Sequence, residues 1–252
     1  MRMNILAIGN SFSQDATHYL SRLAAADGCE MQVYNLYIGG CSLARHWENI
    51  EKDAPDYLLE IGGESTERYV SISQALALLP WDLIVTQQAS HDSGLPETYH
   101  PYLENMLSYL REKAPNAKLY LQETWAYEID SMHPQFVRYH QSQDEMYKAL
   151  KSAYTEAASA NSLALIPCGD VIQTLRKKAP FLYGHGGMSI CRDGFHMNLI
   201  YGRYLLAATW YKTITGRSVR NNPFIPSTKL APNAICDEAV LSVVRETVDE
   251  IA

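Results

Sequence analysis

Long apolar runs are missing from this sequence of 252 residues. No stretch reaches the ~18 consecutive apolar residues that a membrane-spanning helix needs. The apolar run at the N-terminus is too short for a signal peptide, because it ends at the turn residue Gly9. We therefore expect a cytoplasmic protein with no membrane partner.

Positive charge is also scarce. The chain has 21 Lys and Arg residues against 28 Asp and Glu, and its formal net charge is −7 at pH 7. No basic run or basic stripe offsets this balance. Because nucleic acids and anionic membrane surfaces are bound through clustered Lys and Arg, we expect neither as a partner.

Cysteines are few, and their spacing shows no regular pattern. The five of them are odd in number and show no CxxC pattern: Cys29, Cys41, Cys168, Cys191 and Cys236. Disulfide frameworks and structural zinc sites depend on regularly spaced cysteines. We therefore expect reduced thiols, as in a cytosolic protein, and no metal or other cofactor.

The sequence does contain a regular alternation of short apolar runs and longer helical patterns. Apolar residues make up 47% of the chain and charged residues 19%, as in an ordinary globular protein. The expected strands are 4–9, 31–38, 82–87, 117–123 and 163–167, and the expected helices are 14–27, 42–53, 71–79, 98–114, 137–160, 198–216 and 236–251. This alternation predicts one α/β domain over residues 1–252, a three-layer α/β/α sandwich around a mostly parallel, five-stranded sheet.

One segment interrupts the alternation. Residues 56–71 place Gly62 and Gly63 between two short runs that can form strands, which predicts a small β-hairpin inserted before the third strand. A long loop, 124–136, follows the fourth strand. Loops at the carboxyl ends of strands surround the ligand crevice in open α/β sheets, so this loop is expected near the functional site.

The first expected strand runs directly into the turn Gly9-Asn10-Ser11, and a helical pattern follows. Such a turn holds the Ser11 side chain at the carboxyl edge of the sheet, where phosphate-binding loops and catalytic nucleophiles both occur. A Walker loop requires GxxxxGK[ST] and a dinucleotide fold GxGxxG, but GNSFSQDA has neither the second glycine nor the lysine. The turn therefore favours a nucleophile, which needs a base, an orienting acid and oxyanion donors.

His196 stands out among the eight histidines because Asp193 precedes it by three residues in CRDGFHMN. An Asp-x-x-His turn lets the carboxylate lie beside the imidazole without help from a distant part of the fold. An Asp that caps the following helix, beside a surface histidine, gives the same pattern. Combined with Ser11, the motif predicts a Ser–His–Asp triad.

The GNS turn and the DGFH segment resemble the SGNH (GDSL-type) hydrolases, whose first motif carries the nucleophile and whose last motif is Asp-x-x-His. The G-x-S-x-G motif of α/β-hydrolases does not occur in the sequence. Together with GGCSL and LIVTQQAS, the two segments resemble the divergent DUF4886 branch of that superfamily. The resemblance implies a flavodoxin-like fold and a metal-free serine esterase, with Ser11 as nucleophile, His196 as base and Asp193 as the group that orients the base.

The resemblance also implies an oxyanion hole. The N–H groups of Ser11 and of a glycine after the second strand would form part of it, and we expect Gly40, with Gly39 as the alternative. The third SGNH motif, Gly-x-Asn-Asp, is missing from WDLIVTQQASHDSG. A glutamine takes the place of its asparagine in the DUF4886 branch, which implies Gln88 as the third donor, or else Gln87.

Two further residues are expected at the substrate. Trp125, where the fourth strand ends, would line the substrate pocket unless it is a core residue, and His91 would border the crevice. The family implies short-chain esters, most of all acetyl esters of carbohydrates or of other small molecules. Lipase or thioesterase activity, and a non-catalytic ligand-binding protein that has lost its oxyanion geometry, are the alternatives. The oligomeric state is left open.

Overall fold

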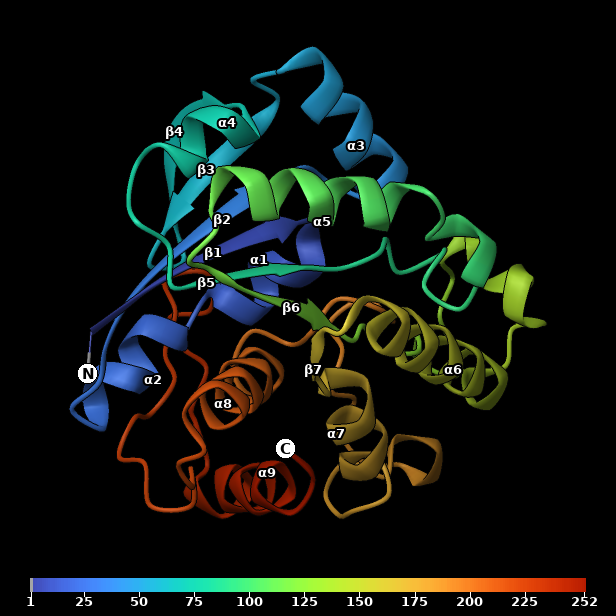
Figure 1. Ribbon diagram of the computed structural model, residues 1–252. Coiled ribbons are helices and arrows are strands. Elements are labelled where there is room, and N and C mark those ends of the chain that lie inside the picture. The colour runs from blue at the N-terminus through green and yellow to red at the C-terminus, as the bar shows by residue number, and fades with distance from the viewer. Residues whose placement is uncertain (1) are drawn as a thin grey trace.

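A single seven-stranded sheet forms the centre of the computed structural model, which describes residues 2–252 (Figure 1). The strand order is β4-β3-β2-β1-β5-β6-β7. The parallel part consists of β1 (Arg2–Gly9), β2 (Glu30–Tyr37), β5 (Leu83–Thr86), β6 (Lys118–Gln122) and β7 (Ala164–Ile166). Because β1 lies between β2 and β5, the turn after β1 is flanked by the loops that follow both of these strands.

The expected hairpin is present and extends the same sheet. β3 (Tyr57–Ile61) and β4 (Glu64–Val70) pair with each other, and β3 also pairs antiparallel with β2. The sheet therefore has seven strands and not the expected five. Gly62 and Gly63 form the turn with φ values of +60° and +84°, which are in the region that favours glycine.

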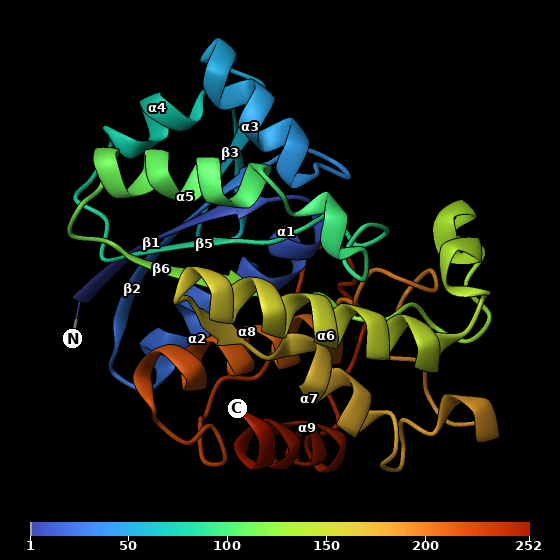
Figure 2. The ribbon, with the colours of Figure 1, turned by 45° about the vertical axis from the view of Figure 1, so that its right-hand side comes forward.

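Helices cover both faces of the sheet, which confirms the α/β/α sandwich (Figure 2). One face carries α3 (Leu43–Lys52), α4 (Ile72–Leu76) and α5 (Tyr102–Lys113). The other carries α1 (Ser11–Thr17), α2 (Leu20–Ala26) and α8 (Tyr201–Thr215), with α9 (Glu238–Ile251) packed outside α8. Near β7 lie α6 (Gln143–Asn161) and α7 (Cys168–Leu175).

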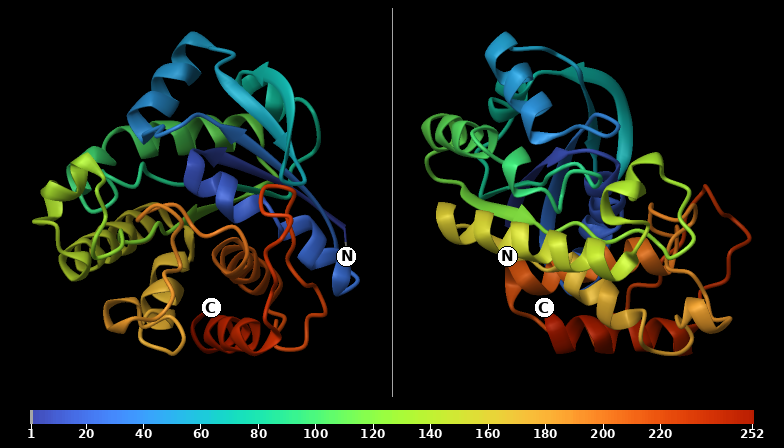
Figure 3. Two further views of the ribbon diagram at one scale, coloured as in Figure 1. Left: turned by 180° about the vertical axis from the view of Figure 1, so that it is seen from behind. Right: turned by 90° about the vertical axis from the view of Figure 1, so that its right-hand side faces the viewer.

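The central helix of the second layer is α8, which packs against α1, α2, α7 and α9. Its residues 201–211 are all buried. Since this helix has no solvent-facing side over that length, apolar and polar residues do not separate into two faces as on a surface helix. After α8, residues 216–237 form a long connection that runs back beside α2 before α9 begins (Figure 3).

Three helical segments differ from the expectation. The pattern over 14–27 is divided into α1 and α2 at His18 and Tyr19, because the buried Tyr19 hydroxyl donates to the Leu199 carbonyl at 2.7 Å and His18 contacts the hairpin. The long pattern 137–160 becomes a helix only at Gln143, after a 3₁₀ turn over Pro134–Tyr139. The short α7 was not expected from the sequence.

Within residues 2–252 there is no helix whose length and apolar character would allow it to cross a membrane.

Candidate active site

The turn between β1 and α1 is built to present Ser11. Asn10 caps α1 by accepting the Phe12 N–H at 3.0 Å, and its amide donates to the Cys41 carbonyl at 3.0 Å. Gly9 is required by packing, because a Cβ at this position would lie 2.6 Å from the Ser13 hydroxyl oxygen. Ser11 is thereby held, partly exposed, at the first position of α1.

His196 and Asp193 lie where the sequence pattern predicts, and the fold brings them to Ser11. The Asp193 carboxylate accepts the backbone N–H groups of Phe195 at 3.2 Å and His196 at 2.8 Å. Its second oxygen lies 2.7 Å from His196 Nδ1, and His196 Nε2 lies 2.8 Å from the Ser11 hydroxyl oxygen. This continuous chain of contacts has the geometry of a Ser–His–Asp triad.

The contacts also define the ring's protonation pattern. A carboxylate only accepts, so Nδ1 carries the proton and Nε2 is left to accept the Ser11 O–H. Burial raises the pKa of Asp193, but the hydrogen bonds from the His196 side chain and backbone outweigh it and bring the pKa below its usual value. Asp193 is therefore ionised at neutral pH and can stabilise an imidazolium at His196.

Asp15, which the sequence analysis did not single out, joins the two halves of the triad. This fully buried carboxylate on α1 accepts the Met197 N–H at 3.0 Å, and it also accepts from Arg192 Nη1 at 3.0 and 2.9 Å and from Arg203 Nε at 2.8 Å. Arg192 and Met197 flank the segment that carries His196. The helix that carries Ser11 thus also anchors the loop that carries His196. The only available signal was an acidic residue one helical turn after Ser11.

Gln87 supports the Ser11 turn through a chain of buried carboxamides. Its amide donates to Asn10 Oδ1 at 2.7 Å, and its carbonyl accepts from Gln122. The Gln122 carbonyl in turn accepts the Trp210 indole N–H at 2.7 Å. Each group in the series hydrogen-bonds the next, so Gln87 supports Asn10, which in turn caps α1.

The structure does not support the expected role of Gln88 as an oxyanion donor. Its amide nitrogen donates to the Thr98 carbonyl at 3.0 Å and to the Thr98 hydroxyl at 3.1 Å. Its carbonyl accepts the N–H groups of Leu43 at 2.9 Å and Ala89 at 2.8 Å. Every polar atom of this fully buried side chain therefore has a structural partner, and the amide nitrogen donates to Thr98.

Two backbone N–H groups remain as oxyanion donors. Within residues 2–252, neither the N–H of Ser11 nor that of Gly40 donates to a protein acceptor. Gly40 is exposed, and its φ of +62° favours glycine. The Asn10–Cys41 hydrogen bond holds this loop against the Ser11 turn. Gly39, the alternative, lies next to it in the same exposed loop.

Trp125 is a core residue and does not line the substrate pocket. It is fully buried, and its ring stacks on Phe12 with the centroids 3.8 Å apart and the planes 6° from parallel. The indole N–H donates to the Phe195 carbonyl at 2.7 Å. Trp125 therefore supports the residue before His196, a role for which its position at a strand end gives no sequence signal.

His91 is partly exposed and belongs to an aromatic group beside the triad. Its ring stacks on His133 at 6.1 Å, His133 contacts Phe195 at 4.8 Å, and Phe195 contacts the His196 ring at 4.2 Å. Burial, followed by the nearby charges of His91 and His196, lowers the pKa of His133. This group forms a rim of aromatic and imidazole rings next to His196.

Within residues 2–252 no cluster of three His, Cys, Asp or Glu side chains is arranged to hold a metal ion.

Similar proteins share both the sequence pattern and the fold. Residues 4–239 match the family described as Domain of unknown function (DUF4886). The crystal structure of a DUF4886 family protein from Bacteroides uniformis has 36% identity and a TM-score of 0.89, with coverage of 99% of this chain and 94% of that chain. No curated protein matches the chain.

More distant structures have the same fold. A proposed SGNH hydrolase from Slackia heliotrinireducens shows 24% identity and a TM-score of 0.58, over 85% of this chain and 100% of that chain. An acetylxylan esterase from Geobacillus stearothermophilus shows 13% identity and a TM-score of 0.55, over 84% of this chain and 94% of that chain. These similarities confirm the SGNH-type fold that the motifs indicate.

Proposed function

Because this chain belongs to the DUF4886 family and has the fold of the SGNH hydrolases, we propose that it is a serine hydrolase of carboxylic esters. The observation that carries the proposal is the unbroken series Ser11 Oγ–His196 Nε2, at 2.8 Å, and His196 Nδ1–Asp193 Oδ2, at 2.7 Å. A related protein that had lost esterase activity would not need to keep these three groups aligned.

In the proposed reaction Ser11 attacks the ester carbonyl carbon while His196 Nε2 takes the hydroxyl proton. The tetrahedral intermediate breaks its bond to the alcohol oxygen, and His196 returns the proton to that alcohol. Water then attacks the acyl-Ser11 ester with the same proton transfers, which releases the carboxylic acid and restores the hydroxyl. Asp193 keeps His196 in the required tautomer and stabilises the imidazolium in both steps.

We assign the binding of the oxyanion to the N–H groups of Ser11 and Gly40. Backbone donors fixed by a helix start and a tight turn require little reorganisation when negative charge develops on the oxygen. Each such donor contributes on the order of 3 kcal/mol to transition-state stabilisation. This assignment replaces Gln88, whose amide hydrogens are bonded to Thr98.

For the substrate we propose short acyl esters, with acetylated carbohydrate as the first choice. The similarity in fold to an acetylxylan esterase supports this choice, although fold alone does not determine substrate. A similarly distant structure is described as a lipase/acylhydrolase from Enterococcus faecalis. Acyl-chain preference therefore has to be measured directly.

The test compares the unmodified protein with Ser11→Ala and with Ser159→Ala, a matched change on the exposed face of α6. We expect 4-nitrophenyl acetate hydrolysis to fall at least ~10³-fold in Ser11→Ala and to stay unchanged in Ser159→Ala. Labelling by a fluorophosphonate should likewise disappear only in Ser11→Ala. Circular dichroism checks that both variants remain folded.

Three results would overturn parts of the proposal. Turnover that survives in Ser11→Ala removes this residue as the nucleophile. An unmodified protein that neither hydrolyses 4-nitrophenyl esters nor reacts with the phosphonate is a ligand-binding protein. A rate that rises steeply from acetyl to octanoyl esters indicates a lipase or thioesterase.

A further inference from the structure

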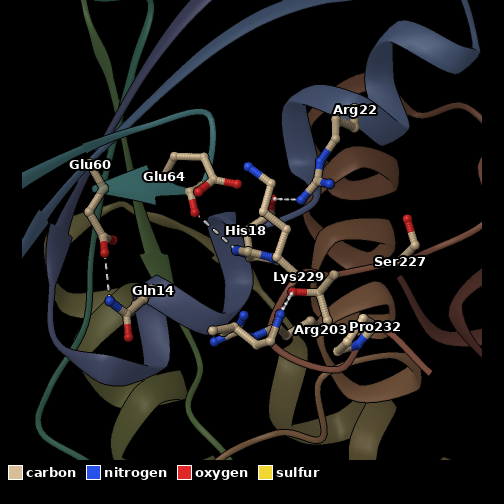
Figure 4. Close-up of a pocket in the computed structure, with 12 residues that line it drawn as sticks. Gln14, His18, Arg22, Glu60, Glu64, Arg203, Ser227, Lys229 and Pro232 are labelled. Carbon is tan, nitrogen blue, oxygen red and sulfur yellow. Dashed lines mark hydrogen bonds between the residues drawn. The ribbon is translucent and has the colours of Figure 1, made fainter. Parts of the chain in front are cut away.

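A cavity lies along α1, beyond the triad residues. It has a volume of about 640 Å³ and is enclosed by α1, α2, the β3–β4 hairpin, α8 and the segment 227–232 (Figure 4). The walls carry charged and amide side chains, and Figure 4 shows these directed toward the interior from opposite sides. None of the triad residues lines this space.

The cavity begins one helical turn from the nucleophile. Gln14 lines it and follows Ser11 by three residues on α1. Side chains three apart on a helix are neighbours, with their Cβ atoms about 5–6 Å apart. Gln14 therefore places one wall of the cavity next to Ser11 on the same helix.

Two nearly inaccessible side chains in the wall have atoms without hydrogen-bond partners. Within residues 2–252, Arg203 Nη1 has no acceptor and His18 Nε2 has no partner, although these residues are only 5% and 8% exposed. Buried polar atoms are nearly always paired. Both side chains line the cavity, so a small movement of either one would bring its unpaired atom to a group bound there.

The two atoms require opposite kinds of partner. His18 Nδ1 lies 3.0 Å from the Gly63 carbonyl and must donate to it, so Nε2 of the neutral ring is an acceptor. Burial, followed by the charges of Arg203 and Arg22, lowers the pKa of His18 to about 4, which keeps the ring neutral at pH 7. Arg203 can only donate.

The rest of the cavity wall also contains both hydrogen-bond donors and acceptors. Glu60 is 5% exposed and acts as an acceptor for Gln14 at 2.5 Å and Asn35 at 2.7 Å. Glu64 and Lys229 add a further acceptor and a further donor at exposed positions. An anion would meet the guanidinium but also the Glu60 carboxylate and the lone pair of His18. A hydroxyl group both donates and accepts, so it satisfies each of these neighbours.

We propose that this cavity is a subsite for a neutral, polyhydroxylated group, namely a sugar ring of the ester that Ser11 cleaves. The inference rests on the proposed function only for the link to cleavage. Sugar binding by the cavity itself can be measured without any reaction.

The binding arm uses Ser11→Ala protein, so that no ester is consumed. Saturation-transfer NMR and calorimetry compare cellobiose and xylobiose as neutral sugars, digalacturonate as an anion and glycylglycine as a zwitterion. His18→Asn is added to remove the Nε2 acceptor while its amide can still donate to the Gly63 carbonyl. His140→Asn is the matched control, since His140 is exposed and pairs with Glu145 outside the cavity.

We expect a neutral disaccharide to bind and His18→Asn to weaken that binding about tenfold, the effect of losing one hydrogen-bond partner. His140→Asn should have no effect. Glu64→Gln, at an exposed position, provides a second variant if His18→Asn has a lowered melting temperature. The proposal is overturned if digalacturonate or glycylglycine binds better than the neutral sugars, if no sugar binds, or if neither variant changes the affinity.

The kinetic arm separates this inference from the proposed function. His18→Asn should raise KM for acetylated xylobiose about tenfold and leave 4-nitrophenyl acetate hydrolysis unchanged, because that ester has no sugar. Unchanged KM for acetylated xylobiose overturns the subsite while esterase activity stands. Sugar binding in Ser11→Ala without any esterase activity in the unmodified protein overturns the function while the subsite stands.

Discussion

At the scale of single residues, the atoms proposed to react are outnumbered by the side chains that hold them in place. Asp15 touches neither Ser11 nor His196, yet it is bonded to Met197, Arg192 and Arg203. Its carboxylate is fully buried, and it balances the charges of the two guanidinium groups. The position of His196 relative to Ser11 therefore depends on a group outside the proposed triad.

Replacing Asp15 with Asn tests this dependence. The amide hydrogens of Asn would face the donors Met197 N–H and Arg192, and the two arginines would lose their shared counter-charge. We expect stability to fall by about 3–5 kcal/mol, as when one partner of a buried ion pair is removed, and kcat to fall with it. Urea unfolding and 4-nitrophenyl acetate kinetics measure both quantities.

Asp144→Asn is the control for this change, because Asp144 pairs with Lys148 on the exposed face of α6. Such surface pairs contribute about 0–1 kcal/mol. If Asp15→Asn behaves like Asp144→Asn in both measurements, Asp15 does not position the catalytic loop.

Replacing either of the two adjacent glutamines after β5 with alanine should affect stability and kcat differently. Gln88→Ala leaves the Leu43 N–H and the Thr98 carbonyl without these partners, each at about 1–3 kcal/mol. We therefore expect lower stability with kcat nearly unchanged in the remaining folded protein. Gln87→Ala removes a support of Asn10 and should lower kcat, because the start of α1 becomes less ordered.

The same pair of variants can contradict this assignment. A drop of roughly 10²- to 10³-fold in kcat for Gln88→Ala, with unchanged stability and KM, is the result for an oxyanion donor. That outcome requires the Gln88 amide to leave Thr98 when substrate is bound.

At the scale of elements, the start of α7 illustrates how a helix absent from the sequence-based expectation is stabilised. Glu123, which follows β6, accepts the Asp170 N–H at 2.9 Å in the first turn of this helix. Gly169 permits the approach, because a Cβ there would lie 2.3 Å from the Thr124 carbonyl oxygen. Neither contact is local in sequence, so the eight-residue segment has only a weak helical signal of its own.

Glu123 should give the protein a characteristic pH dependence. Burial, and secondly the charge of Asp170, raises the pKa of Glu123 to about 8 from the usual 4.5. The folded state therefore binds this proton more tightly than the unfolded state does. Its stabilising contribution is complete below about pH 4.5 and is lost as the pH rises to about 8.

We expect Glu123→Gln to reduce this loss of stability between pH 5 and 8, because a neutral amide does not ionise. The difference in unfolding free energy across that range should be on the order of a few kcal/mol. Urea unfolding at several pH values measures it, with Glu156→Gln on the exposed face of α6 as the control. Parallel pH profiles for Glu123→Gln and the unmodified protein would show that Glu123 is already ionised in the folded state.

At the scale of the whole molecule, the fold brings the two ends of the proposed triad together. Ser11 follows the central strand β1, while Asp193 and His196 come from the segment just before α8. Because α8 packs against α1 and α2, that segment is delivered to the carboxyl edge of the sheet beside Ser11. The same packing places Arg203, near the start of α8, in the wall of the cavity along α1.

The hairpin and the connection after α8 form the remaining walls of this cavity. Glu60 and Gly63 come from the hairpin, and Lys229 comes from the connection. These segments lie far apart in the chain but close the same cavity around α1 (Figure 4). The sequence pattern predicted the hairpin, whereas its contact with His18 depends on the pairing of β3 with β2.

The sequence by itself determined the features that short-range physics controls. The five parallel strands follow from apolar runs between turns, and the GNS turn follows from a strand that meets a helix start. The Asp193–His196 contact spans three residues, so one turn is sufficient to form it. These features needed no knowledge of the partners supplied by the rest of the chain.

Only the tertiary structure decided the features whose partners are distant in sequence. Gln88 faces Thr98 and Leu43, Trp125 is covered by Phe12, and Asp15 meets arginines from the other end of the chain. A sequence shows that these side chains can donate, accept or stack, but the direction in which each points depends on which elements pack together. Burial then fixes these hydrogen-bond partners, because a polar group that water cannot reach must bond to the neighbours that the fold provides.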